Sequence, residues 1–302
     1  MPNRLLLELA ERPTFERLVT SSSLARPVVQ RFVAGESLDD AVAAARRLRD
    51  AGITAVLDHL GEHVRTVVQA DAARDDYLEA LRRVAAERLD AHISVKLTQL
   101  GLDLSFEGCI ARLRSVCAEA RDARTRVAID MESHRHTDAT IEAYRQLRPR
   151  YDHLVLCLQA YLKRTPADLK ALMPVQPAIR LCKGAYNEPK EIRLSAQRTR
   201  AAFRQMLMTL LRETPYTAVA THDELLLREA VRQARRRLLP PERYELQMLH
   251  GVRRDLQAQL VEQGYRVRVY VPFGGEWYPY LMRRIAERPG NLRLFLEAVV
   301  RG

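Results

Sequence analysis

The chain has 302 residues, 47% of them hydrophobic, so it can form one large domain or two smaller ones around a packed core. No apolar run approaches the ~20 residues that a membrane-spanning helix needs, and the first residues lack the apolar segment and cleavage site of a secretory signal. We therefore expect a cytoplasmic protein. The net charge of +11 could attract nucleic acid, but the basic residues are dispersed and aromatic residues make up only 6%, so we expect no nucleic-acid partner.

The residue types that commonly bind metals form no convincing site. The four cysteines contain no Cys-x-x-Cys pair, which argues against both a zinc ribbon and a disulfide framework. Glu132, His134 and His136 alternate, but three ligands within five residues would strain a tetrahedral geometry. We therefore expect no metal.

Residues 1–52 are expected to form short helices that precede the main fold. Ser37 is a suitable N-cap for a helix over Leu38–Asp50, and Gly52 ends that helix. From residue 53 to residue 302, short apolar runs alternate with stretches of helical periodicity. The expected strands are Ile53–Leu57, His92–Leu97, Arg126–Met131, Leu154–Gln159, Ala178–Cys182, Thr217–Ala220, Tyr244–Met248 and Val267–Val271. The expected helices between and after them are Asp76–Leu89, Phe106–Ala120, Thr137–Leu147, Thr165–Met173, Ile192–Arg212, Glu224–Leu238, Arg253–Gln263 and Trp277–Glu287.

This alternation of strands and helices is typical of a (β/α)8 barrel of the TIM type, and a doubly wound open sheet is the alternative. No Gly-x-Gly-x-x-Gly follows any expected strand, which counts against a Rossmann nucleotide site. The last helix, Trp277–Glu287, follows the break at Gly274 and Gly275, and we expect it to lie over the barrel mouth.

Polar residues stand where the expected strands end, and in a barrel these positions converge on one site. They are Asp58, Lys96, Asp130, Glu132, Gln159, Arg180, Lys183, Thr221, His222, Glu245, Gln247 and Tyr270. Ionisable side chains inside strands are costly unless they are paired or functional. A structural layer of ion pairs is one explanation, but so many polar strand ends favour a shared functional site.

Three of these positions leave several roles open. Lys96 lies between apolar neighbours, so it could form a Schiff base with a carbonyl substrate, bind an anion, or snorkel at a strand end. Asp130 and Glu132 are two residues apart, so they share one face if the strand continues that far. Carboxylates on one face would suit a general base, a metal, or the anchoring of arginines opposite.

Two pairs of cations suggest anion binding. Arg180 and Lys183 lie beside Gly184-Ala185, where small residues let a phosphate or an electron-rich ring approach the backbone. The adjacent Arg283 and Arg284 on the last helix could hold a small carboxylate or phosphate through paired guanidinium groups. The alternative for this second pair is a solvated basic face.

A series of motifs, taken in order, resembles the proline dehydrogenase family in its stand-alone bacterial form. The motifs are Leu60-Gly-Glu62, Ser94-Val-Lys-Leu-Thr98, Ile129-Asp-Met-Glu132, Gln159-Ala-Tyr-Leu162, Arg180-Leu-Cys-Lys-Gly-Ala-Tyr186, Ala220-Thr-His-Asp223, Glu245-Leu-Gln-Met-Leu-His-Gly251, Arg268-Val-Tyr-Val-Pro-Phe-Gly274 and Tyr280-Leu-Met-Arg-Arg-Ile-Ala-Glu287. They cover nearly all of residues 50–291, so coincidence is improbable.

This resemblance implies a distorted (β/α)8 barrel that holds FAD without a Rossmann domain. It implies that L-proline is oxidised to Δ1-pyrroline-5-carboxylate, the first step of proline catabolism to glutamate, and that electrons pass to a membrane quinone. It also implies a separate pyrroline-5-carboxylate dehydrogenase, and it allows a peripheral contact with the inner face of the cell membrane. Two other hypotheses are a Schiff-base lyase that uses Lys96 or Lys183 on the same barrel and a basic binding protein for nucleic acid or acidic membrane.

The resemblance assigns substrate contacts to five residues. Arg283 and Arg284 would clamp the proline carboxylate with help from Lys96. Tyr270 and Leu249 would pack on the proline ring. The physical reasoning agrees, because paired guanidinium groups suit a small carboxylate.

The resemblance also implies catalytic, gating and cofactor residues. Asp130 takes the position of an active-site acid, and Arg180 would lie near the flavin N5. Glu62 would act as a gate that pairs with Arg283 over bound proline. The other residues expected to hold the flavin are Met131, Gln159, Lys183, Gly184, Ala185, Thr221 and His222.

Overall fold

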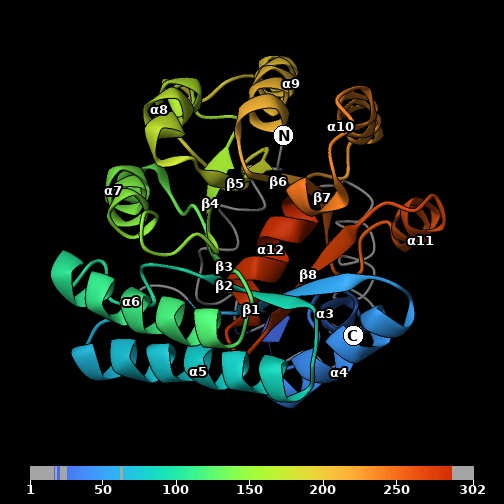
Figure 1. Cartoon of the computed structure of the whole chain (residues 1–302). Helices are drawn as coiled ribbons and strands as arrows, with labels where there is room; N and C mark the ends of the chain where they lie inside the picture. Colours follow the sequence, from blue (N-terminus) through green and yellow to red (C-terminus); the bar gives the residue numbers. More distant parts are fainter. Residues whose placement is uncertain (1–16, 18, 21–25, 62–63, 288–302) are drawn as a thin grey trace.

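Eight parallel strands form a closed barrel with helices around its outside (Figure 1). The computed structural model describes residues 17, 19–20, 26–61 and 64–287. The strands are β1 (Thr54–His59), β2 (Ala91–Val95), β3 (Val127–Ile129), β4 (Leu154–Gln159), β5 (Ala178–Cys182), β6 (Tyr216–Ala220), β7 (Tyr244–Leu249) and β8 (Val267–Phe273). Each strand pairs with the next, and β8 pairs with β1, which closes the ring. The expected (β/α)8 barrel is confirmed, and the open sheet is excluded.

Several of the helices begin at a residue whose side chain caps the first turn. Ser37 caps α4 as expected, whereas α5 begins at Val67 rather than Asp76 because Thr66 and Gln69 form a capping box. The described α-helices are α3 (Arg26–Phe32), α4 (Leu38–Asp50), α5 (Val67–Ala86), α6 (Phe106–Asp122), α7 (Thr137–Leu147), α8 (Thr165–Leu172), α9 (Ala196–Glu213), α10 (Glu224–Arg236), α11 (Arg254–Glu262) and α12 (Trp277–Glu287). Short 3-10 turns lie at His134–His136, Met173–Val175 and Pro241–Arg243.

Two strands are shorter than the apolar runs suggested. β2 ends at Val95 and β3 ends at Ile129, so Lys96 and Asp130 come directly after their strands. The Asp130 N–H still donates to the Val95 carbonyl at 2.9 Å, which keeps the two chain segments side by side. Both charged side chains therefore start from the mouth of the barrel.

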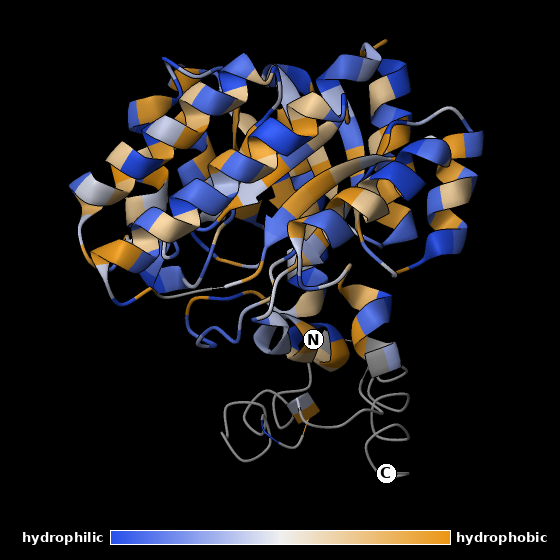
Figure 2. Ribbon diagram, turned by 90° about the horizontal axis from the view of Figure 1, so that it is seen from below, coloured by the Kyte–Doolittle hydropathy of each residue, from blue (hydrophilic) through white to orange (hydrophobic). Residues whose placement is uncertain are grey.

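The helices α4 and α12 do not connect consecutive strands: α4 precedes β1, and α12 follows β8. α4 packs outside the barrel against β1 and β8. α12, which follows β8, lies instead across one end of the barrel (Figures 1 and 2). Its side chains Leu281 and Ile285 are fully buried in one cluster with Phe32 of α3 and with Leu60. A domain boundary at residue 52 stays a prediction.

Buried side chains of the strands and of the surrounding helices together form a continuous apolar core. In α5, for example, Tyr77, Leu81 and Val84 are buried on one side of the helix. Hydrophilic residues alternate with hydrophobic ones along the outer helices (Figure 2). In the described part of the chain, no helix has the combined length and apolar character that crossing a membrane requires.

The end of the barrel opposite the mouth is closed by buried charges. Arg268 of β8 is fully buried, and its Nε donates to Glu245 Oε1 of β7 at 2.8 Å. Its two terminal nitrogens donate to the Ala55 carbonyl and to Asp90 Oδ1, each at 2.9 Å. Burial opposes the charge of Glu245, but the Arg268 guanidinium holds the pKa of that carboxyl below its ordinary value. This pair is a structural element of the fold.

We predict that Arg268→Met destabilises the protein by about 3–5 kcal/mol, because the buried Glu245 carboxylate loses its nearer cation and keeps the more distant Arg266, at 3.4 Å. The double variant Arg268→Met with Glu245→Met should recover most of that loss, since two apolar side chains replace the pair. Urea unfolding monitored by circular dichroism measures both values. A single variant as stable as wild type would show that the pair contributes nothing to the fold.

Candidate functional site

At the mouth of the barrel, one carboxylate joins two strands. Arg180 of β5 donates from Nη1 to Asp130 Oδ1 at 2.6 Å and to Ser94 Oγ at 2.9 Å. Tyr270 of β8 donates from its hydroxyl to Asp130 Oδ2 at 2.5 Å. The Arg180 guanidinium carbon also lies 5.4 Å from the centre of the Tyr270 ring. We call Asp130, Arg180 and Tyr270 the mouth cluster.

The protonation states of the mouth cluster follow from burial and charge. Burial, strengthened by the Asp130 carboxylate, raises the pKa of Tyr270 well above its ordinary value, so the phenol stays protonated and can donate. Burial opposes the charge of Arg180, but Asp130 outweighs it and the pKa of Arg180 is raised. At neutral pH Arg180 therefore keeps its positive charge beside the Asp130 carboxylate, and Tyr270 stays neutral.

A second buried ion pair lies beside this cluster. Lys96 Nζ is 2.5 Å from Asp58 Oδ1, and the two side chains are only 6% and 1% exposed. Burial raises the pKa of Asp58 although Lys96 opposes that shift. Behind the pair, the Tyr77 hydroxyl of α5 accepts the Lys96 backbone N–H at 3.3 Å. Asp58 thus orients the Lys96 ammonium group.

Glu132 does not join Asp130, because β3 ends at Ile129 and the strand alternation stops there. The condition for a shared carboxylate face is therefore not met. The Glu132 carboxylate instead accepts the Thr98 N–H at 3.1 Å and the Thr98 hydroxyl at 2.5 Å. Its backbone carbonyl accepts the Gln159 amide at 2.9 Å. Glu132 fixes the loop that follows β3.

The two histidines that alternate with Glu132 have other partners. His134 bonds to Glu188, and His136 Nε2 lies 2.8 Å from Asp103 Oδ1. Across residues 17, 19–20, 26–61 and 64–287, no three His, Cys, Asp or Glu side chains are grouped so that they could hold a metal ion.

The loop between β5 and α9 approaches its neighbours closely. Gly184 has a φ of +115°, and a Cβ there would lie 2.2 Å from a ring carbon of Tyr161, so only glycine fits. Lys183 Nζ and Arg200 Nε both donate to Asp223 Oδ2 at 2.8 Å. Burial opposes the charge of Asp223, but these two cations hold its pKa below the ordinary value. Two positive charges therefore share one carboxylate at this loop.

The ends of β6 and β7 are tied together next to this loop. The Thr221 hydroxyl accepts a hydrogen bond from the backbone N–H of Asp223, the N-cap of α10, at 3.1 Å. His222 Nε2 accepts the Leu249 N–H at 3.0 Å. Met131, after β3, is buried, and Ala185 is half-buried. These four expected site residues all follow the carboxyl ends of strands, and Leu249 is the last residue of β7.

The two arginines of α12 contact aromatic rings. The Arg283 guanidinium carbon lies 5.3 Å from the centre of the Tyr186 ring, in the loop after β5. The Arg284 guanidinium carbon lies 5.4 Å from the Tyr280 ring, and Arg284 is 9% exposed. Arg283 therefore connects α12 to the loop that carries Lys183. Glu62, the predicted gate, lies outside the described residues.

The structure adds residues to which the sequence assigned no role. Asp58 was visible as a polar strand end, and Ser94 lies in β2 two residues before Lys96. Tyr186 belongs to the Gly-Ala-Tyr motif. Tyr77 had no sequence signal, because it reaches the site from the middle of the outer helix α5.

A closed parallel barrel with buried ion pairs at the carboxyl ends of its strands defines a (β/α)8-barrel enzyme. The family model for proline dehydrogenase matches residues 41–293. The chain is 36% identical to proline dehydrogenase 1 of Bacillus subtilis over 90% of each chain. It is 34% identical to proline dehydrogenase of Deinococcus radiodurans, over 98% of this chain and 97% of that one. The chain belongs to the proline dehydrogenase family, as its motifs suggested.

A comparison of folds agrees with this membership. The crystal structure of proline utilization A from Bdellovibrio bacteriovorus, inactivated by N-propargylglycine, matches with a TM-score of 0.81 at 21% identity. The match covers 98% of this chain, which spans only 40% of that longer chain. At this identity the likeness establishes the barrel fold alone.

We predict that Gly184→Ala destabilises the protein by about 1–3 kcal/mol, because the new methyl group meets the Tyr161 ring in a strained backbone conformation. Gly275→Ala is the matched control, since Gly275 has no atom within 4 Å of an added Cβ. Thermal unfolding of the two variants beside wild type measures the difference. Equal stability of the two variants would contradict the close packing of this loop.

Proposed function

We propose that the chain oxidises L-proline to Δ1-pyrroline-5-carboxylate with FAD as the hydride acceptor. The observation that carries this proposal is the state of Arg180. Its Nη1 is held by Asp130 and Ser94. Within the described part of the chain, its Nε and Nη2 are buried without a hydrogen-bond partner. An unsatisfied buried donor costs about 1–3 kcal/mol, so these N–H groups are suited to a bound acceptor.

A flavin fits these donors, because its ring presents nitrogen and carbonyl acceptors. The adjoining loop supports the phosphate half of FAD in the same way. Among the described residues, Lys183 and Arg200 share one carboxylate, Asp223, so positive charge is left for a pyrophosphate. The residues that would hold FAD are Met131, Gln159, Arg180, Lys183, Gly184, Ala185, Thr221 and His222.

When bound, FAD would accept the hydride that leaves C5 of proline. The residues of the chain would position the substrate for this transfer. Arg283, Arg284 and Lys96 would hold the carboxylate, and Asp58 would keep the Lys96 ammonium in place. Tyr270 and Leu249 would pack against the proline ring.

Asp130 and Arg180 would have a shared role in catalysis. Asp130 accepts hydrogen bonds from both Arg180 and Tyr270, so it would fix the orientation of the cation and of the phenol. The fixed charge of Arg180 would stabilise negative charge that develops beside it during the transfer. In this arrangement Asp130 holds the site together.

The remaining parts of the proposal rest on the family resemblance. They are a membrane quinone as the final electron acceptor, a peripheral contact at the inner face of the cell membrane, and a separate pyrroline-5-carboxylate dehydrogenase that uses the product. Glu62 is proposed as a gate that pairs with Arg283 over bound proline. A cytoplasmic location is part of the same proposal.

A visible absorption spectrum tests the proposal directly. We expect a yellow purified protein whose flavin absorption is bleached by L-proline without oxygen. The lyase hypothesis predicts a colourless protein that borohydride traps with its carbonyl substrate. The ion pairs of Lys96 with Asp58 and of Lys183 with Asp223 argue against that hypothesis, since Schiff-base formation needs a neutral amine. A colourless protein, with or without borohydride trapping, would overturn the assignment.

We predict that Arg283→Met or Arg284→Met lowers kcat/KM for proline by about 2–5 kcal/mol of transition-state binding, because each loses a charge-assisted bond to the carboxylate. The flavin should stay bound and reducible by dithionite in both variants. Arg114→Met, at an exposed position of α6, is the control for loss of one positive charge. If both variants retain the kcat/KM of the control, these arginines do not clamp the substrate.

A further inference from the structure

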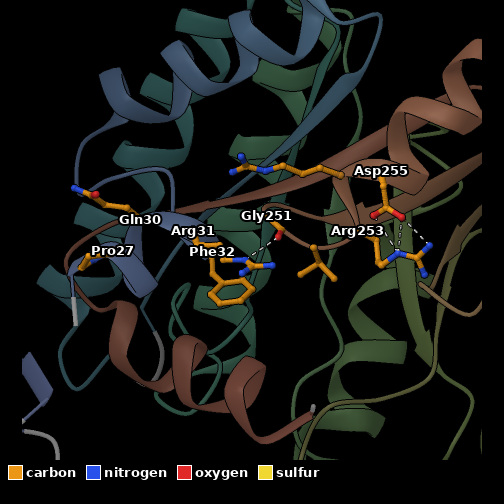
Figure 3. Close-up of a pocket in the computed structure, with 9 residues that line it drawn as sticks. Pro27, Gln30, Arg31, Phe32, Gly251, Arg253 and Asp255 are labelled. Atoms are coloured by element: carbon orange, nitrogen blue, oxygen red, sulfur yellow. Dashed lines mark hydrogen bonds and ion pairs between the residues drawn. The ribbon is translucent and has the colours of Figure 1, made fainter. Parts of the chain in front are cut away.

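A cavity lies between α3 and the loop that joins β7 to α11, and no residue of the mouth cluster lines it (Figure 3). Its volume is about 650 Å³, within the range of small-molecule sites. The lining residues are Pro27, Gln30, Arg31, Phe32, Gly251, Val252, Arg253, Arg254 and Asp255. None of these residues has a role in the proposed proline or flavin sites, so a ligand of this cavity is independent of the proposed function.

The cavity has an excess of positive charge. Three arginines and one aspartate line it, which gives a formal charge of 3 − 1 = +2. Arg253 is ion-paired at 2.9 Å with both Glu224 and Asp255. Arg31 and Arg254, in contrast, have no carboxylate partner among the residues that the structure describes. Arg31 donates from Nε to the Gly251 carbonyl at 3.4 Å (Figure 3), which leaves its two terminal nitrogens outside that contact.

The loop after β7 packs closely against α3. Gly251 presses against α3 so closely that a Cβ would lie 1.7 Å from the Arg31 carbonyl oxygen. Arg253 adopts a left-handed conformation with φ 51° and ψ 50°, which is unfavourable for a side chain of its size. Arg254 follows as the first residue of α11, where the helix dipole favours anions and disfavours cations.

The pKa of a neighbouring histidine reflects the positive charge around the cavity. Burial, together with Arg254 and Arg47, lowers the pKa of the neighbouring His250 to about 4. The histidine is therefore neutral at physiological pH, and it adds no further charge. Phe32 and Val252 give the cavity an apolar wall beside its arginines. A ligand with an anionic group and an adjoining apolar portion would match both the arginines and the apolar wall of the cavity.

We propose that this cavity, the α3–α11 pocket, binds a phosphate group through Arg31 and Arg254. A phosphate carries one negative charge as a diester and close to two as a monoester, and its acceptor oxygens match the two guanidinium groups, which have no carboxylate partner within the described part of the chain. The phosphate could belong to an acidic phospholipid headgroup, whose glycerol and acyl carbons would meet Phe32 and Val252. It could also belong to a soluble phosphate ester.

Calorimetric titration of the flavin-loaded protein with inorganic phosphate tests the pocket itself. We expect wild type to bind phosphate in the millimolar range, and Arg31→Gln or Arg254→Gln to bind it at least about tenfold more weakly, since each removes a charge-assisted bond. Arg114→Gln removes the same charge at an exposed site on α6 and should bind as wild type does. Thermal unfolding without phosphate checks that all variants are folded.

Cosedimentation with vesicles then identifies the source of the phosphate. Binding to phosphatidylglycerol vesicles but not to phosphatidylcholine vesicles, lost in both pocket variants and reduced by free phosphate, would assign a lipid headgroup. Phosphate binding without vesicle binding would assign a soluble ester. If wild type binds no phosphate at millimolar concentrations, or if the pocket variants bind it as tightly as Arg114→Gln does, the proposal is overturned.

Discussion

A charged group inside a closed barrel must meet an opposite charge, because its burial without a partner costs several kcal/mol. This constraint organises the structure from one end to the other. Arg268 with Glu245 occupies the end opposite the mouth, while Arg180 with Asp130 and Lys96 with Asp58 lie at the mouth. Each pair joins side chains from different strands, so barrel closure and charge pairing require each other.

The two ends of the barrel differ in how completely their charges are satisfied. The Arg268 guanidinium uses all three of its nitrogens on Glu245, Asp90 and the Ala55 carbonyl. The Arg180 guanidinium uses one nitrogen, and in the described residues the other two are buried without an acceptor. Full satisfaction is what stability needs, whereas the incomplete satisfaction at Arg180 is what a ligand site needs. The same type of pair therefore serves the fold at one end and the chemistry at the other.

The position of α12 determines which arginines reach the mouth. α4 packs against β8 and β1 on the outside, and α12 lies across the barrel end together with α3. Arg283 is thereby placed over Tyr186 rather than in solvent. The same arrangement sets α3 against the loop after β7, and this contact forms the α3–α11 pocket. The sequence gives a net positive charge for the whole chain. The fold places the charged side chains in buried ion pairs, at the mouth of the barrel and around a separate cavity.

The sequence by itself determined the strands, most helices and the polar strand ends, because periodicity, caps and turn residues act over a few neighbouring positions. It also determined the family, through motifs such as Arg180-Leu-Cys-Lys-Gly-Ala-Tyr186. Only the tertiary structure decided which charges meet. Asp58 and Lys96 are paired across 38 positions, and Tyr77 enters the site from an outer helix. Glu132 turned away from Asp130 because β3 ends at Ile129, and strand ends depend on pairing with neighbouring strands rather than on local sequence.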